Sequence, residues 1–290
     1  IVHTWLFAAN SYGRKAALAA GVKHIVAGER CVDRWKSWPH FFIDRWLARR
    51  TDAIATNSVA VRDFYVRHGV PQHKFHVISN GVNSPSLSPA GIDVPQRAAI
   101  CQELNLPPDT KLIAAVGRLW PQKNYKHLLW AMCLLKEIRS DFHLLILGDG
   151  PHRWRLERYG RQVQIINEHV TFMGERNDVQ RYMPAITCLV NTSQYEGQSN
   201  SILEAMAAGR PVVATDIPGN RDLVIDEQTG ILIPLGDRAE FARRVNMLLD
   251  DEAEVLRLGK AGWQRAKSQF SVTSMIERYA SLYRELLDSP

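Results

Sequence analysis

The chain has 290 residues and a hydrophobic content of 46%, which is enough to bury one or two ordinary cores. No apolar run approaches the roughly 18 residues that a membrane-spanning helix needs, and four widely spaced cysteines are typical of buried thiols in a reducing compartment rather than of a disulfide framework or a metal site. Residues 1–100 carry 13 Lys+Arg against 6 Asp+Glu and the remainder carries 23 against 24, so the basic first third favours an anionic partner such as a nucleic acid, a phosphorylated acceptor or a membrane surface.

The first segment, which runs to about residue 93, alternates strands and helices. We predict strands at 1–5, 24–28, 53–55 and 75–78, and helices at 13–20, 43–49 and from Ser58 to near Gly69. This alternation predicts a parallel sheet with helices on both faces. Because the chain opens on Ile1 inside a strand-like stretch, we expect that this is not the natural beginning of the protein. The start of the chain shows no charged segment followed by an apolar run, so we do not predict secretion.

The stretch 30–50, RCVDRWKSWPHFFIDRWLARR, interleaves aromatic rings and cations. Its members are Trp35, Trp38, Phe41, Phe42 and Trp46, with Arg34, Lys36, Arg45, Arg49 and Arg50. An interfacial segment needs this combination, because rings lie at the headgroup level and cations on anionic lipid. The alternative is that Phe42, Trp46 and Leu47 pack inward at helical spacing while the cations are solvated. The sequence leaves both interpretations open.

A linker rich in Pro, Ser and Gly is predicted at 84–96, and a second domain follows it to about residue 269. We predict an entry helix at 98–105, strands at 111–116, 143–148 and 229–234, a helix at 125–139 and a last helix at 271–287. The turn Gly148-Asp149-Gly150-Pro151 is no evidence for dinucleotide binding, because the sequence contains no G-x-G-x-x-G.

Residues 193–216, SQYEGQSNSILEAMAAGRPVVATD, lie between two buried strands. We predict a strand at 188–190, a loop that bends at Gly197, a helix at 202–208 and a strand at 212–214. Ser199, Asn200 or Ser201 can each cap this helix. Ligands bind outside the carboxyl ends of such strands, where helix N-termini present N–H groups to phosphate.

Two carboxylates frame this turn, Glu196 in the loop and Glu204 in the helix. A carboxylate is a strong acceptor for paired O–H donors, so both lie where a sugar hydroxyl could be held. Either one alone would more often be a solvated surface group.

The string EGQSNSILEAMAAGRPVVATD resembles, nearly residue for residue, the donor-site motif of the family 4 glycosyltransferases of the GT-B fold, whose paired glutamates match Glu196 and Glu204. VGRLWPQKN is similar to the basic donor motif of that family, and places Arg118 and Lys123 at the carboxyl end of a strand. VTFMGERNDVQRYMPAITCLV resembles its base-binding strand and loop, with Phe172–Gly174 beside the nucleobase.

The resemblance implies an α/β chain of two Rossmann-like domains with parallel sheets. Residues 1–95 resemble the second half of the acceptor-side domain, 96–270 the nucleotide-sugar domain, and 271–290 the helix that crosses back to the first domain. The first half of the acceptor-side domain, with its Gly-rich turn, has no counterpart here, so we expect the first domain to be incomplete.

The resemblance also implies a retaining, metal-independent glycosyltransferase that needs no cofactor and uses a nucleotide-diphosphate sugar of the UDP or GDP type. The nucleotide diphosphate departs, and an acceptor hydroxyl attacks the oxocarbenium-like sugar from the same face. The implied catalytic residues are Glu196, which holds the sugar, and Arg118 and Lys123, which hold the diphosphate. The implied donor-binding residues are Glu204 at the ribose with Gly197, Ser199, Asn200, Ser201, Phe172 and Gly174.

One position departs from the family. In much of the family the strand that matches HIVAG ends in a catalytic-site His, whereas this chain has Glu29 and Arg30 there. Arg30 and His3, at the mouth of the first strand, are the candidate acceptor-side residues. A lone His at a strand end is more often structural.

We therefore expect a cytoplasmic enzyme, or one peripheral on the inner face of the membrane, that transfers a sugar to a sugar- or lipid-linked acceptor in cell-envelope or polysaccharide biosynthesis, with no nucleic acid as partner. The alternatives are a sugar-nucleotide epimerase of the same fold and a non-catalytic fragment that binds a nucleotide sugar. With the half-domain missing, we expect donor binding without efficient transfer. The base, sugar, acceptor and oligomeric state stay open.

Overall fold

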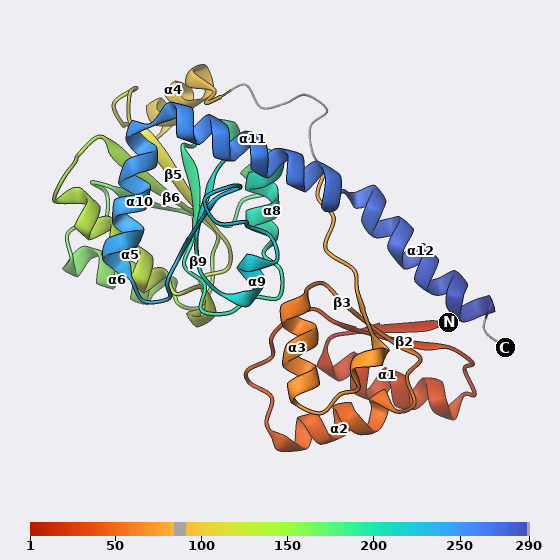
Figure 1. Cartoon of the computed structure of the whole chain (residues 1–290). Coiled ribbons are helices and arrows are strands. Elements are labelled where there is room, and N and C mark those ends of the chain that lie inside the picture. The colour runs from red at the N-terminus through yellow and green to blue at the C-terminus, as the bar shows by residue number, and fades with distance from the viewer. Residues whose placement is uncertain (84–90, 289–290) are drawn as a thin grey trace. The chain divides into compact units, whose positions relative to one another are not determined.

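A computed structural model describes residues 1–83 and 91–288, which form two compact units (Figure 1). The first unit comprises Ile1–Gly81, Glu196–Gln198 and the segment from Phe270 onward, and the second comprises Val82–Tyr195 and Ser199–Gln269. The two units divide between Gly81 and Val82, before the predicted linker and the predicted boundary between residues 95 and 96. Residues of the predicted linker already pack with the second unit, since the Asp93 N–H donates to the Pro184 carbonyl at 2.9 Å. Residues 84–90 of that linker lie outside the described residues.

The first unit is built on a four-stranded parallel sheet in the order β1–β2–β3–β4. Its strands are β1 (Val2–Trp5), β2 (Ile25–Glu29), β3 (Ala53–Thr56) and β4 (Phe75–Val77). Its helices are α1 (Phe7–Ala19), α2 (Trp38–Ala48), α3 (Val59–Arg67), the short 3-10 helix η1 (Gln72–Lys74) and α12 (Val272–Asp288).

Both faces of this sheet are buried. On one face Ala27 packs in a cluster with Phe41 of α2 and Tyr65 of α3. On the other face Val26, the neighbouring residue of β2, packs in a cluster with Leu282 of α12. Because successive strand residues point to opposite faces, a sheet covered on both sides needs apolar residues at every position. This explains the continuous apolar runs from which parallel strands were predicted.

The second unit contains a six-stranded parallel sheet in the order β10–β9–β8–β5–β6–β7. Its strands are β5 (Lys111–Val116), β6 (Phe142–Leu147), β7 (Val170–Gly174), β8 (Cys188–Asn191), β9 (Val212–Thr215) and β10 (Ile231–Ile233). Its helices are α4 (Val94–Glu103), α5 (Tyr125–Lys136), α6 (Arg153–Gln162), α7 (Val179–Tyr182), α8 (Asn200–Ala207), α9 (Pro218–Arg221), α10 (Arg238–Asp250) and α11 (Glu252–Gln269), with the 3-10 helices η2 (Pro121–Lys123) and η3 (Met183–Ala185).

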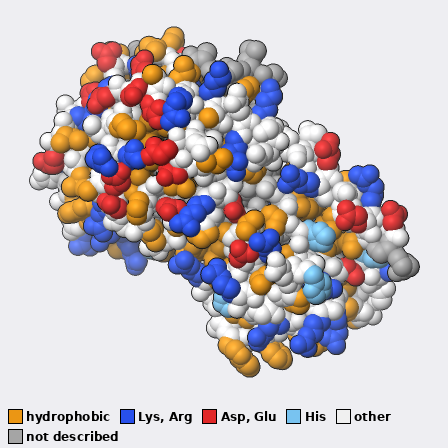
Figure 2. All heavy atoms as spheres, in the orientation of Figure 1, with side chains coloured by type: hydrophobic (Ala, Val, Ile, Leu, Met, Phe, Trp, Pro, Cys, Tyr) orange, Lys and Arg blue, Asp and Glu red, His pale blue; other side chains and the backbone are white. Residues whose placement is uncertain are grey.

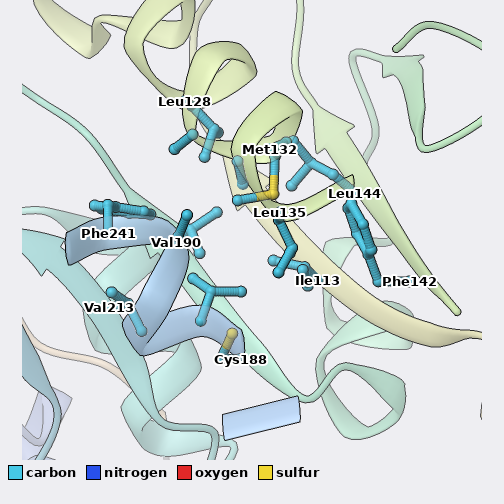
Figure 3. Close-up of a cluster of buried hydrophobic side chains, with 14 of the residues drawn as sticks. Ile113, Leu128, Met132, Leu135, Phe142, Leu144, Cys188, Val190, Val213 and Phe241 are labelled. Atoms are coloured by element: carbon cyan, nitrogen blue, oxygen red, sulfur yellow. The ribbon is translucent and has the colours of Figure 1, made fainter. Parts of the chain in front are cut away.

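Helix α5 packs on this sheet through one apolar stripe (Figure 3). Leu128, Met132 and Leu135 recur at helical spacing and are fully buried in a cluster with Ile113 of β5 and Val190 of β8. Each such side chain contributes about 1.5–3 kcal/mol of burial free energy, so the cluster forms a rigid base for the loops at the strand ends.

Four helices begin earlier than predicted: α1 at Phe7 rather than Gly13, α2 at Trp38 rather than Ile43, α4 at Val94 rather than Ala98, and α8 at Asn200 rather than Ile202. Local caps explain two of them. The Ser37 N–H donates to His40 Nδ1 at 3.1 Å before α2, and Asp93 accepts from the Gln96 N–H at 2.9 Å before α4. None of the described helices is both long and apolar enough to cross a membrane.

Candidate active site

Strand β5 is the point where the strand order of the second sheet reverses. It has β6 on one side and β8 on the other. The loops that follow β5 and β8 therefore turn to opposite faces of the sheet, which leaves a crevice at the carboxyl end of β5. Gly117 and Arg118 directly follow this strand. The predicted cation at position 118 thus lies where doubly wound sheets bind ligands.

A cavity of about 530 Å³ opens at the carboxyl ends of β5, β6 and β7. Its lining consists of Val116, Gly117, Arg118, Leu147, Gly148, Asp149, Gly150, Glu175, Arg176 and Val179. Pockets of about 300–1,000 Å³ suit ligands the size of a nucleoside. The cavity is therefore large enough for the nucleoside part of a donor.

Phe172 and Gly174 lie at the end of β7, as predicted, but the cavity wall comes from the residues that follow them. The Phe172 carbonyl accepts from Arg153 Nη2 at 3.5 Å, and the Gly174 carbonyl accepts from the Gly148 N–H at 2.7 Å. These carbonyls thus support the loops. Glu175 and Arg176 supply polar groups that the sequence analysis did not assign to the site.

The turn at 148–151 is a second feature that the sequence analysis did not assign to the site. A Cβ atom on Gly148 would lie 2.2 Å from the Gly117 carbonyl oxygen, and one on Gly150 would lie 2.7 Å from that of Leu119. Gly148 also has φ +142°, which side chains rarely adopt. The glycines therefore allow the loop after β6 to lie directly on the loop after β5. Their spacing in the sequence was the available signal.

Lys123 is positioned by hydrogen bonds between the loop after β5 and the loop after β8. The Gln194 N–H donates to the Gln122 carbonyl at 2.9 Å, and Thr192 Oγ1 donates to the Lys123 carbonyl at 3.0 Å. The Lys123 side chain lies over Gly117, where a Cβ would be 3.2 Å from its Cε. The two predicted cations, Lys123 and Arg118, therefore both lie near the carboxyl end of β5.

Helix α8 begins at the carboxyl end of β8. Ser199 occupies its N-cap position, but Ser199 Oγ lies 3.0 Å from Ser201 Oγ and accepts from Asn191 Nδ2 at 3.3 Å, rather than capping a backbone N–H. Asn200 is the first helical residue and is exposed. The N-terminus of a helix carries partial positive charge, so this end favours an anion.

The predicted glutamates fall in different units. Glu204 lies on α8 in the second unit, where burial raises the pKa of its half-buried carboxyl. Glu196 and Gly197 group with the first unit, so they are not part of the nucleotide crevice described above. Across residues 1–83 and 91–288, no three His, Cys, Asp or Glu side chains gather closely enough to hold a metal ion.

The first unit has its own cavity, of about 490 Å³, at the carboxyl ends of β1 and β2. Its lining consists of Trp5, Leu6, Phe7, Gly28, Glu29, Arg30, Cys31, Asp33 and Trp35. Arg30, predicted on the acceptor side, belongs to this wall, with its guanidinium 5.4 Å from the Trp5 ring. Aromatic rings and carboxylates together are suited to a polyhydroxylated ligand.

An ionic network holds the carboxylates of this cavity. Lys36 is buried, with Nζ 2.9 Å from Asp44 and 3.6 Å from Glu29. The Tyr65 hydroxyl donates to Glu29 at 2.8 Å and lies 2.9 Å from Asp33. Burial raises the pKa of Glu29. The sequence analysis placed Lys36 among interfacial or solvated cations, which is wrong, because three carboxylates draw its ammonium inward.

His3, the other acceptor-side candidate, lies on β1 and packs against α12. Its Nδ1 lies 2.7 Å from the Tyr283 hydroxyl, and its ring stacks on Trp5 at 4.2 Å. Burial lowers the pKa of His3 to about 4, so the ring is neutral near pH 7. These contacts favour the structural interpretation of this His.

Comparison with known proteins agrees with this architecture. Residues 1–81 match the glycosyl transferase 4-like domain, and residues 110–251 match the glycosyl transferases group 1 domain. The chain belongs to the group 1 glycosyltransferases.

Two curated relatives are 28% identical to the chain. One is the lipopolysaccharide core biosynthesis glycosyltransferase LpsE of Rhizobium meliloti, matched over 81% of the chain and 64% of its own length. The other is the UDP-Gal:alpha-D-GlcNAc-diphosphoundecaprenol alpha-1,3-galactosyltransferase of Escherichia coli, matched over 99% of the chain and 76% of its own length.

Among solved structures, Anabaena HepE in complex with UDP and glucose superposes with a TM-score of 0.85 at 22% identity, over 98% of the chain and 78% of HepE. The sucrose-phosphate synthase of Thermosynechococcus elongatus also reaches 0.85, at 24% identity, over 99% of the chain and 74% of that enzyme. The GT-B fold with two parallel sheets is thereby confirmed.

Proposed function

We propose that the chain carries out retaining transfer of a sugar from a nucleotide-diphosphate sugar to an acceptor hydroxyl. The observation that carries the proposal is that Arg118 and Lys123 both lie near the carboxyl end of β5, at the switch point of the second sheet, where Arg118 lines a cavity large enough for a nucleoside. A departing nucleotide diphosphate develops negative charge, and fixed cations stabilise that charge most where water is excluded.

We propose the remaining roles from the family resemblance together with the elements on which the groups lie. The base and ribose enter the cavity between the loops after β5, β6 and β7, and Glu204 accepts hydrogen bonds from the ribose hydroxyls. The diphosphate lies against Arg118, Lys123 and the N-terminal end of α8, and Glu196 holds the sugar. As the diphosphate departs, the acceptor hydroxyl attacks from the face that it leaves. Because cationic side chains neutralise the departing group, the proposed reaction needs no metal ion.

The relatives favour a UDP-sugar as the donor, since HepE was crystallised with UDP and glucose and the Escherichia coli relative is named for UDP-Gal. Their names also favour a sugar- or lipid-linked acceptor in lipopolysaccharide or other polysaccharide biosynthesis. We therefore propose a cytoplasmic reaction at the inner face of the membrane. The acceptor enters the cavity of the first unit, where Trp5, Trp35 and Arg30 lie.

Calorimetric titration with UDP and with GDP tests the donor site. Arg118→Ala and Lys123→Ala each remove a charge-assisted contact, so each should weaken nucleotide binding by about 1.5–3 kcal/mol. Lys126→Ala is the matched control, because Lys126 is exposed on α5 with its Nζ 4.8 Å from the Tyr159 ring. Unchanged affinity in both site variants would rule out this site.

A product assay with a panel of UDP-sugars then separates the reaction types. Sugar transfer that continues in the presence of EDTA supports the proposal. Inversion at C2 of the sugar without transfer would indicate an epimerase, and binding without either product would indicate a non-catalytic fragment.

A further inference from the structure

Helix α2 presents an unusual surface. Five large hydrophobic side chains in the segment 35–46 are exposed: Trp35 at 58%, Trp38 at 71%, Phe42 at 54%, Ile43 at 37% and Trp46 at 38%. Only the opposite face of the helix packs on the unit, through the buried residues Phe41, Asp44, Leu47 and Ala48. Of the two interpretations that the sequence left open, the inward packing of Phe42 and Trp46 is therefore wrong.

Charge is segregated across the same segment. The carboxylate of the segment, Asp44, points inward, because it pairs with Lys36 at 2.9 Å and with Arg14 at 3.4 Å. Asp33, just before the segment, also lies 3.4 Å from Lys36. Arg49 and Arg50 are exposed at the end of the helix. Apolar and basic side chains thus share the exposed side of this segment, and Figure 2 shows hydrophobic and basic side chains together at the lower edge of the first unit.

This face is preformed. Ser37 and His40 cap the helix, and Pro39 sits in its first turn. Trp38 and Phe42 stack on each other at 5.8 Å, and the Arg50 guanidinium lies 4.5 Å from the Trp46 ring. A docking partner therefore meets an ordered surface and need not order a disordered segment on binding.

We propose that the outer face of α2, formed by Trp38, Phe42, Ile43, Trp46, Arg49 and Arg50, docks the first unit on an anionic lipid surface. The rings enter the headgroup layer and the arginines pair with lipid phosphates, as in helices that lie in a membrane interface. The proposal deepens the proposed function, because it names the element that brings the acceptor side to the membrane.

Charge disfavours a second copy of the chain as the occupant, because a two-fold contact would bring together two copies of the same basic unit. Residues 1–81 carry 12 Lys+Arg against 5 Asp+Glu, a balance that suits an anionic surface. Nucleic acid is disfavoured because one face of Trp38 is turned toward Phe42 and one face of Trp46 toward Arg50, which leaves fewer ring faces on which bases could stack.

The test is flotation with vesicles of phosphatidylcholine, alone or mixed with phosphatidylglycerol. The chain should bind the mixed vesicles and lose affinity as salt rises. Trp38→Ser should weaken binding about tenfold or more. The double charge reversal Arg49→Glu with Arg50→Glu should weaken it at least about 20-fold, since each cation near an anionic surface contributes about a fivefold gain.

Helix α6 offers matched controls on the other unit. It also carries an exposed Trp154, at 57%, and the exposed Arg158 and Arg161. Trp154→Ser, and Arg158→Glu with Arg161→Glu, change the same residue types without touching α2, so they should leave vesicle binding unchanged. Equal losses from the α6 and α2 variants would show that composition, not this face, governs binding.

Three other outcomes would overturn the proposal. They are absence of vesicle binding, equal binding to neutral vesicles, and a wild-type dimer in sedimentation that the Trp38→Ser variant abolishes. Titration with a single-stranded homopolymer tests nucleic acid as the partner. If the arginine reversals abolish binding to the homopolymer but leave binding to vesicles unchanged, the partner is nucleic acid. Far-UV circular dichroism and the unfolding transition of the first unit verify that each α2 variant folds, and UDP titration verifies the second unit. Loss of vesicle binding with UDP binding intact separates failure of docking from failure of the proposed function.

Discussion

At the scale of single residues, the candidate donor site combines groups with different chemistry. Arg118 presents a planar fork and Lys123 a compact charge, so the two are not interchangeable toward a diphosphate. Glu204 differs from both, because burial on α8 raises the pKa of its carboxyl. A ribose that donates hydrogen bonds to this carboxylate would favour its ionised form and offset part of the desolvation that raises its pKa.

The two glutamates should therefore respond differently to mutation. Glu204→Ala should weaken free UDP and UDP-sugar alike, by about 1–3 kcal/mol, because it removes an acceptor for the ribose. Glu196→Ala should spare free UDP and weaken only the sugar-bearing donor. Calorimetry with both ligands provides the measurement, and Glu137→Ala, at an exposed site at the end of α5, is the control. Equal losses for both ligands in both variants would contradict the division of roles.

At the scale of elements, loops packed against each other define the site. The turn after β6 lies on the loop after β5 through Gly148, and the 3-10 helix η2 is hydrogen-bonded to the loop after β8. The positions of Arg118 and Lys123 thus depend on backbone contacts within and between these loops.

Gly148→Ala should destabilise the second unit by at least about 3 kcal/mol, because it adds a clash at 2.2 Å to an unfavourable φ of +142°. Gly236→Ala is the matched control: Gly236 also has a positive φ, of +100°, but nothing lies within 4 Å of its Cβ position. Strain alone should cost about 1 kcal/mol there. Urea denaturation measures both, and similar losses would show that the close approach of the loops is unimportant.

The contact between β1 and α12 should be sensitive to pH through His3. Its pKa falls from 6.5 to about 4 on folding, so below pH 6.5 the unfolded chain takes up a proton that the folded chain refuses. The stability that the neutral ring contributes is therefore present above pH 6.5 and lost as the pH falls toward 4. Urea denaturation at several pH values should show a shallower decline for His3→Gln than for the wild type. His73→Gln, at an exposed site in the same unit, should keep the wild-type slope.

At the scale of the whole molecule, two units with separate sheets and separate cores make up the chain. The predicted nucleotide-binding cations and the larger hydrophobic cluster belong to the second unit, and the basic excess belongs to the first. Ligands that bind one unit should therefore stabilise that unit selectively.

Scanning calorimetry should resolve two unfolding transitions, of which UDP raises only the one that belongs to the second unit. At about one hundred times its dissociation constant, UDP should add about 2.7 kcal/mol to the stability of that unit. The Lys123→Ala variant should require more UDP for the same shift. A single transition that moves as a whole would contradict independent units.

The sequence alone determined the parallel sheets, the basic motif after the strand at 111–116, and the order of strand, loop and helix in residues 188–208. These features are local: apolar runs of strand length identify strands buried on both faces, and the spacing of Gly197, Glu204 and Gly209 is readable along one loop and helix. Resemblance in the same segments identified the family, because loops at strand ends carry the chemistry that distinguishes one doubly wound fold from another.

Only the tertiary structure decided which side chains are buried in segments that combine aromatic and charged residues. In the segment 30–50 it turns Phe41 inward and Trp38 outward, and it buries Lys36 against Glu29 and Asp44. It likewise pairs His3 with Tyr283, at the other end of the chain. A basic or aromatic side chain suits either a surface or a buried network, and its choice depends on partners that are distant in sequence and meet only when the sheets and helices pack.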